Sequence, residues 1–215
     1  MIPIVPAIIP VSAAQLTNTL AQLAFSPEVH VDVVDGVFVP SISWPYNPTG
    51  DPQTTKLVTD GFTLEVDLMV EQPLEAADAW LAAGADMLVF HVETISLEAF
   101  KRFAQSTNIS IGVCALNGTP LETLFSYLEV ADYVQVMGIA KIGAQGQPQD
   151  ARVFERIAAI RTQFPNLPIC VDGSVNTQTI ARLAKAGVNR FICGSAIVGN
   201  PDPKAAHAEL SAIIN

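Results

Sequence analysis

The chain alternates between short apolar segments and longer amphipathic segments from one end to the other. Eight short segments are apolar at nearly every position, which is the pattern of parallel strands buried on both faces. These predicted strands span residues 4–9, 29–33, 64–69, 87–91, 110–116, 133–137, 169–172 and 190–193. Between them, apolar residues recur at helical spacing and predict amphipathic helices. These predicted helices span residues 12–25, 74–83, 96–105, 120–128, 150–164, 176–186 and 203–214.

The order of these segments predicts the fold class. Eight strands, each followed by a helix or loop that returns to the next strand, indicate an α/β protein of the (β/α)8 TIM barrel type. A doubly wound sheet would have fewer strands and a glycine-rich first turn, whereas residues 9–12 contain no glycine. Because no linker or shift in composition divides the chain, we expect residues 1–215 to form one domain.

One segment interrupts the alternation. Residues 36–52 contain four prolines, Trp44 and Tyr46, and they follow the second predicted strand. In a TIM barrel such a loop lies on the face that carries the active site. Its aromatic residues either cover a bound ligand or pack the loop against the barrel, and the sequence leaves both interpretations open.

The composition limits the classes of partner and the cellular compartment that fit this chain. Half of the 215 residues are apolar, only 15% are charged, and the formal net charge is −10. This acidic balance argues against a nucleic-acid binder, and no apolar run is long enough to span a bilayer. Cys114, Cys170 and Cys193 lie in apolar runs without a CxxC spacing, which is typical of core thiols in a reducing compartment. We therefore expect a cytoplasmic protein.

Polar residues at strand ends provide the candidate chemistry. His30 and Asp32 are two positions apart in an apolar strand, so both side chains point to the same face. Burying an imidazole and a carboxylate side by side is costly, and a metal ion or a substrate between them would explain it. Asp67, His91 and Asp172 come from three other strands and would converge on the same barrel mouth. Together they suggest a site for Zn²⁺, Mn²⁺, Fe²⁺ or Mg²⁺.

Simpler roles compete with this interpretation. An aspartate at a strand end often forms a turn, which suits Asp35 before Gly36. Asp86 and Asp132 precede strands and are interpreted as capping residues. His91 could equally be a core histidine with satisfied hydrogen bonds, and we expect His207 on the last helix to be solvated.

Three small-residue turns follow the sixth, seventh and eighth strands. They are residues 143–147, Gly173-Ser174 and Gly194-Ser195. TIM barrels commonly bind phosphate with backbone amides from their late turns, where glycine allows a close approach. The turns therefore predict a site for a phosphorylated ligand.

The residues that carry these features match a known family. Segments 30–40, 68–73, 90–93, 171–176 and 194–197 give the chain a close resemblance to ribulose-phosphate 3-epimerases over nearly its full length. The resemblance implies a ribulose-phosphate-binding barrel and an isomerase of pentose phosphate metabolism. Such an enzyme interconverts ketose phosphate epimers by metal-assisted proton transfer through an enediolate. Family members often assemble, so a homo-oligomer is expected as well.

The resemblance also implies a role for individual residues. Asp32 and Asp172 would be the acid and base, and His30, Asp32, Asp67 and Asp172 would bind a divalent metal ion. The residues expected beside the phosphorylated sugar are Met69, His91, Met137, Gly146, Gly173, Ser174, Gly194 and Ser195.

Several positions depart from the family pattern. Asp67 stands where the family usually has histidine, Ala7 where it has serine, and the loop around Lys141 lacks the usual Asn-Pro-Gly turn. With Asp67 as a ligand, the harder oxygen-rich site would favour Mn²⁺ or Mg²⁺ over Zn²⁺; with Asp67 outside it, the site would be weakened or lost. These departures keep two alternatives open: a related lyase of the hexulose-phosphate synthase or aldolase type, and a non-catalytic binder of phosphorylated ligands.

Overall fold

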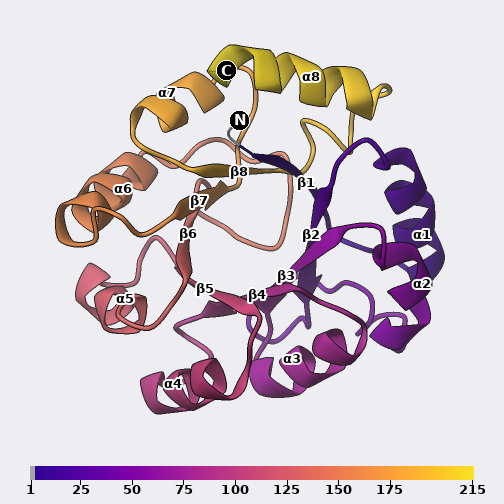
Figure 1. The fold of residues 1–215 in the computed structure, drawn as a ribbon, viewed down its shortest axis with the longest axis horizontal. Helices are drawn as coiled ribbons and strands as arrows, with labels where there is room; N and C mark the ends of the chain where they lie inside the picture. The colour runs from indigo at the N-terminus through magenta and orange to yellow at the C-terminus, as the bar shows by residue number, and fades with distance from the viewer. Residues whose placement is uncertain (1–2) are drawn as a thin grey trace.

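Eight parallel strands close into a barrel in chain order, with β1 hydrogen-bonded to both β2 and β8 (Figure 1). The computed structural model describes residues 3–215. The strands are β1 (Ile4–Ile8), β2 (Glu28–Val34), β3 (Thr63–Met69), β4 (Met87–His91), β5 (Ser110–Ala115), β6 (Tyr133–Met137), β7 (Ile169–Asp172) and β8 (Arg190–Cys193). The prediction of a (β/α)8 barrel is confirmed, and the doubly wound alternative is wrong.

The helices form a ring outside the strands (Figure 1). They are α1 (Ala13–Gln22), α2 (Lys56–Thr59), α3 (Pro73–Ala82), α4 (Leu97–Ser106), α5 (Leu121–Leu128), α6 (Arg152–Gln163), α7 (Ile180–Lys185) and α8 (Pro203–Ile214). Seven of them fall within the predicted segments or within a residue of them. The exception is α2, which a 3₁₀ turn (η1, Pro52–Thr55) precedes. The sequence pattern did not predict α2, because a helix of four residues is too short for an amphipathic repeat and its Leu57 is 90% exposed.

Local signals set the helix ends. Ser12 and Ser96 cap α1 and α4 by accepting hydrogen bonds from the backbone N–H groups of Gln15 and Ala99. Gly84, after α3, has a φ of +98°, a left-handed conformation that glycine adopts without strain. The serines thus begin helices that follow β1 and β4, and Gly84 lies in the turn that leads from α3 to β4.

The long loop after β2 packs against the barrel. Trp44 is buried, and its ring meets that of Trp80 in α3 edge to face, with 5.9 Å between centroids. The backbone N–H of Trp44 also donates to the carbonyl of Pro10. Of the two interpretations of this loop, packing is therefore the one that holds for Trp44.

Two further sequence expectations concern residues away from the barrel mouth. Asp86 and Asp132 accept hydrogen bonds from the backbone N–H groups of Leu64 and Ile111, which confirms their structural role. The expectation of a solvated His207 is wrong. Its Nε2 lies 3.0 Å from the carbonyl oxygen of Ile4, and its ring packs on Phe25, because α8 folds back over β1.

The three cysteines are buried and unpaired, as expected. Within residues 3–215, every helix is too short or too polar to cross a bilayer.

Candidate active site

The pairing of β2 with β3 builds the centre of the site. In this parallel register His30 lies beside Glu65, and Asp32 lies beside Asp67. Residues two apart on a strand share a face, so all four side chains project into the barrel interior. All four are buried, with at most 4% of the residue exposed.

His30 bridges two carboxylates. Its Nδ1 lies 2.5 Å from Glu65 Oε2, and its Nε2 lies 3.2 Å from Asp32 Oδ1. Burial alone would lower the pKa of His30, but the carboxylates of Glu65 and Asp32 outweigh it and raise that pKa well above its usual value. Glu65 therefore fixes the ring so that Nε2 faces Asp32.

A compensated ion network lies beneath His30. Arg190 donates to Glu65 Oε2 over 2.6 Å and to Glu28 Oε2 over 3.0 Å, while the hydroxyl of Tyr133 donates to Glu65 Oε1 over 2.6 Å. Burial would raise the pKa of Glu65, but Arg190 and then His30 outweigh it and hold that pKa far below its usual range. Gly112 makes this possible, because a Cβ there would lie 2.4 Å from the Tyr133 ring.

Asp67 is held by side chains from two other strands. Its Oδ1 lies 2.9 Å from His91 Nε2, and its Oδ2 accepts a 2.7 Å hydrogen bond from Gln135 Nε2. His30, Asp32 and Asp67 each offer a ligand atom, and these atoms lie within 4.8 Å of one another. One imidazole nitrogen and two carboxylates form a donor set that fits a hard divalent cation. Asp172 is outside this group.

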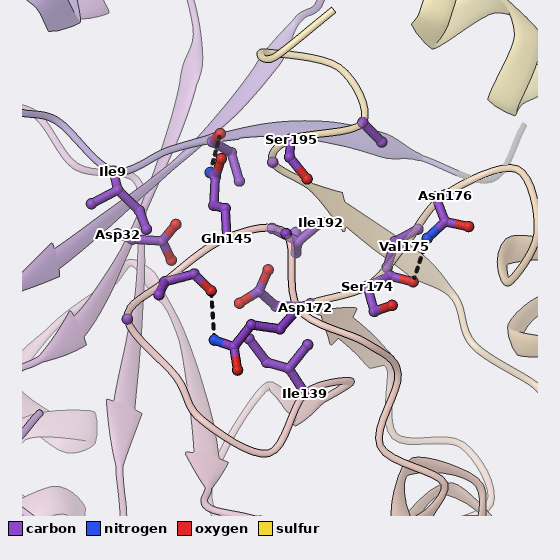
Figure 2. A pocket seen from close by; sticks show the side chains of 18 of the residues that line it. Ile9, Asp32, Ile139, Gln145, Asp172, Ser174, Val175, Asn176, Ile192 and Ser195 are labelled. Atoms are coloured by element: carbon purple, nitrogen blue, oxygen red, sulfur yellow. Dashed lines mark hydrogen bonds between the residues drawn. The ribbon is translucent and has the colours of Figure 1, made fainter. Parts of the chain in front are cut away.

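A cavity of about 230 Å³ opens above these residues at the barrel mouth (Figure 2). Asp32 from β2 and Asp172 from β7 both line it, and their carboxylates point into it (Figure 2). Burial raises the pKa of Asp172 well above its usual value, and the nearby Asp32 carboxylate raises it further. Burial likewise raises the pKa of Asp32, although His30 opposes the shift. Such raised values are typical of carboxylates that exchange protons with a ligand.

Small-residue turns also line the cavity. Gly146, the Gly173-Ser174 turn and the Gly194-Ser195 turn all line it. Gly173 and Ser174 have φ values of +96° and +54°, and Ser174 is the only non-glycine residue among residues 3–215 with positive φ. Thr179 Oγ1 holds this unusual turn by donating to the Ser174 carbonyl over 2.6 Å. Consecutive amides in such a conformation can converge on an anion.

The predicted site residues divide into two groups. Met69, Asp32, Asp172, Gly146 and the two glycine-serine turns line the cavity. His30, Asp67, His91 and Met137 are buried and are not among its lining residues. His91 is only half satisfied as a core histidine, because its Nε2 is paired with Asp67 while its buried Nδ1 has no hydrogen-bond partner among residues 3–215.

The sequence interpretation missed Glu65, Gln135 and Gln145. Glu65 and Gln135 are polar residues at inward-facing strand positions, the same signal that singled out His30 and Asp32. Gln145 lies in a loop, and its position over the cavity depends on tertiary structure.

Comparison with known proteins agrees with this geometry. The model of the ribulose-phosphate 3 epimerase family matches residues 3–198. The chain belongs to this family. The ribulose-phosphate 3-epimerase of Mycobacterium tuberculosis is 32% identical over 214 residues, covering 96% of this chain and 90% of the relative. That of Bacillus subtilis is 30% identical and covers 98% of both chains.

Solved structures of other barrels share the fold. A 3-hexulose-6-phosphate synthase from Salmonella typhimurium aligns with a TM-score of 0.73 at 15% identity, covering 99% of this chain and 98% of the other. A 3-keto-L-gulonate-6-phosphate decarboxylase from Vibrio cholerae aligns with a TM-score of 0.74 at 13% identity, covering 100% and 98%. At these identities the likeness concerns the barrel architecture alone.

Proposed function

We propose that this protein is an epimerase of a ketose phosphate, of the ribulose-5-phosphate 3-epimerase type. The observation that carries the proposal is the pair of acidic side chains, Asp32 and Asp172, that project into one cavity from different strands. Relatives about 30% identical over the full length bear the name ribulose-phosphate 3-epimerase. A cavity of about 230 Å³ that holds two acidic side chains suits a small phosphorylated sugar.

The two carboxyl groups perform the proton transfer in this proposal. Inversion at a carbon next to a ketone requires one group that removes the proton and a second group that returns a proton to the opposite face. Asp32 and Asp172 reach the cavity from β2 and β7, so a substrate can lie between them. Their raised pKa values allow one of them to hold a proton while the other is ionised.

His30, Asp32 and Asp67 are the residues that would hold a divalent metal ion. The family resemblance alone suggests Asp172 as a further ligand. A bound ion would polarise the substrate ketone and stabilise the negative charge of the enediolate. The chain prepares this donor set in advance. Glu65 orients the His30 ring, while His91 and Gln135 orient the Asp67 carboxylate.

The phosphate group would bind at the small-residue turns that line the cavity. The backbone amides at Gly146, Gly173-Ser174 and Gly194-Ser195 supply hydrogen-bond donors without a buried cation. Binding there would place the sugar chain toward Asp32 and Asp172. Assembly into a homo-oligomer and a cytoplasmic location stay predictions.

Incubation with D-ribulose 5-phosphate in D₂O tests the proposal. We expect deuterium at C3 and formation of the C3 epimer, measured by NMR. A lyase would instead cleave the substrate or condense it with an aldehyde. A protein that binds the substrate but leaves its C3 proton in place would contradict epimerase activity.

A further inference from the structure

Part of the cavity wall is apolar. Ala7, Ile9, Ile139 and Ile192 line the same cavity as the two aspartates and the small-residue turns, and the three isoleucines are labelled in Figure 2. None of these side chains can form a hydrogen bond. A hydroxylated carbon chain bound there would leave water and lose hydrogen bonds, at a cost of about 1–3 kcal/mol for each unsatisfied group.

Gln145 is one of the polar residues that line the same cavity. It belongs to the loop after β6 and extends across the mouth, where its Nε2 donates to the Ala7 carbonyl of β1 over 3.3 Å (Figure 2). It also packs over Gly194, because a Cβ there would lie 2.4 Å from Gln145 Nε2. Its Oε1 accepts no hydrogen bond from any group within residues 3–215.

The neighbouring glutamine has a different role. Gln147 Nε2 donates to the carbonyls of Lys141 and Ala144, so its side chain stabilises its own loop. Gln145 makes no such bond within the loop and is tied only to the opposite side of the cavity. The loop is thus held without the Gln145 carboxamide, which leaves that group available to a ligand.

We propose that Gln145 is a specificity-determining residue that recognises the hydroxylated carbon chain of the substrate. A carboxamide both donates and accepts, which matches a sugar hydroxyl, whereas a phosphate offers only acceptors. On binding, the amide exchanges its long hydrogen bond with Ala7 for hydrogen bonds to the substrate. This inference rests on the proposed function, since it takes the ligand to be a sugar phosphate.

Calorimetric titration of Gln145→Ala with two ligands tests the assignment. For D-ribulose 5-phosphate we expect about tenfold weaker binding, because the variant loses one to two hydrogen bonds to the sugar. For inorganic phosphate we expect affinity within about twofold of wild type, because the turns that bind it are intact. Gln178→Ala is the matched control, because Gln178 lies outside this cavity. This variant should bind both ligands with wild-type affinity.

The possible results separate this inference from the proposed function. Equal weakening of both ligands would assign Gln145 to the phosphate and overturn the inference, as would unchanged affinity for both. A wild-type protein that binds inorganic phosphate but not D-ribulose 5-phosphate would contradict the proposed function as well. Because Gln145 is exposed at the cavity, circular dichroism should show a folded Gln145→Ala variant.

Discussion

Two groups of acidic side chains lie in the same barrel, and their pKa values are shifted in opposite directions. At the lower level, Glu65 is surrounded by Arg190, Tyr133 and His30, and its pKa is lowered. At the mouth, burial raises the pKa values of Asp32 and Asp172. The positive charge of His30 lowers both values but does not cancel the effect of burial.

The contrast indicates different roles for the two groups of acidic side chains. The charge of the buried Glu65 carboxylate is balanced by a cation, and its oxygens accept hydrogen bonds from neighbouring side chains. We therefore assign the Glu65 network to stability and to positioning His30. At the mouth, the buried Asp32 and the partly buried Asp172 lack such a set of partners, and a bound cation, proton or substrate can supply them. The two regions should therefore respond differently to substitution.

The largest expected effect is on catalysis at the mouth. Asp172→Asn and Asp32→Asn should each lower kcat by about 10²–10⁴-fold, the usual contribution of a general acid or base. Both variants should fold, because asparagine removes a buried charge. Steady-state kinetics and thermal unfolding measure the two effects. Asp132→Asn, at the far end of the barrel, is the control and should keep its kcat.

The next largest effect is on stability at the lower level. Arg190→Met leaves Glu65 buried without its cation and should lower the free energy of unfolding by about 3 kcal/mol. Adding Glu65→Gln to Arg190→Met removes that charge, while the oxygen of the new carboxamide can still accept from Tyr133. The double variant should therefore be more stable than Arg190→Met in urea unfolding. If Arg190→Met unfolds like wild type, the network does not stabilise the barrel.

The link between the two regions should appear in metal affinity. Glu65→Gln weakens the orientation of His30 and should lower Mn²⁺ affinity by about 10–100-fold, as measured by calorimetry. Glu28→Gln alters the far end of the same network and is the matched control, with affinity near that of wild type. Equal loss in both variants would point to general destabilisation instead.

The smallest effects concern the pH dependence of stability in metal-free protein. Because the pKa of Glu65 is lowered, its contribution is complete above about pH 4.3 and is lost as the pH falls below that value. The raised pKa of Asp172 has the opposite sign, so stability is lost as the pH rises from about 3.9 through its folded pKa. In urea unfolding, the free energy of unfolding of Asp172→Asn should therefore rise relative to that of wild type as the pH increases. A constant difference across pH would contradict the assigned shift.

The sequence predicts much of this molecule because its signals are local or periodic. The strand and helix patterns reveal the barrel, and the two-residue spacing of His30 and Asp32 places them on one face. Contacts that depend on the register between strands are harder to predict. Glu65 meets Arg190 only once β8 and β3 have closed into the same barrel, 125 residues apart in the chain.

The loops show the same limit. Trp44 packs against Trp80, and Gln145 reaches Ala7, through contacts that no local pattern encodes. The position of Asp67 beside His91 and Gln135 likewise follows from the arrangement of three strands.

Proton exchange measured separately from each epimer tests the central claim most directly. D-ribulose 5-phosphate and D-xylulose 5-phosphate are incubated in D₂O with Asp32→Asn and with Asp172→Asn, and the C3 proton is followed by NMR. If the two carboxyl groups act on opposite faces, each variant should lose exchange with one epimer, and the two losses should be complementary. Loss with the same epimer in both variants, or wild-type exchange with both epimers in either variant, would contradict the account.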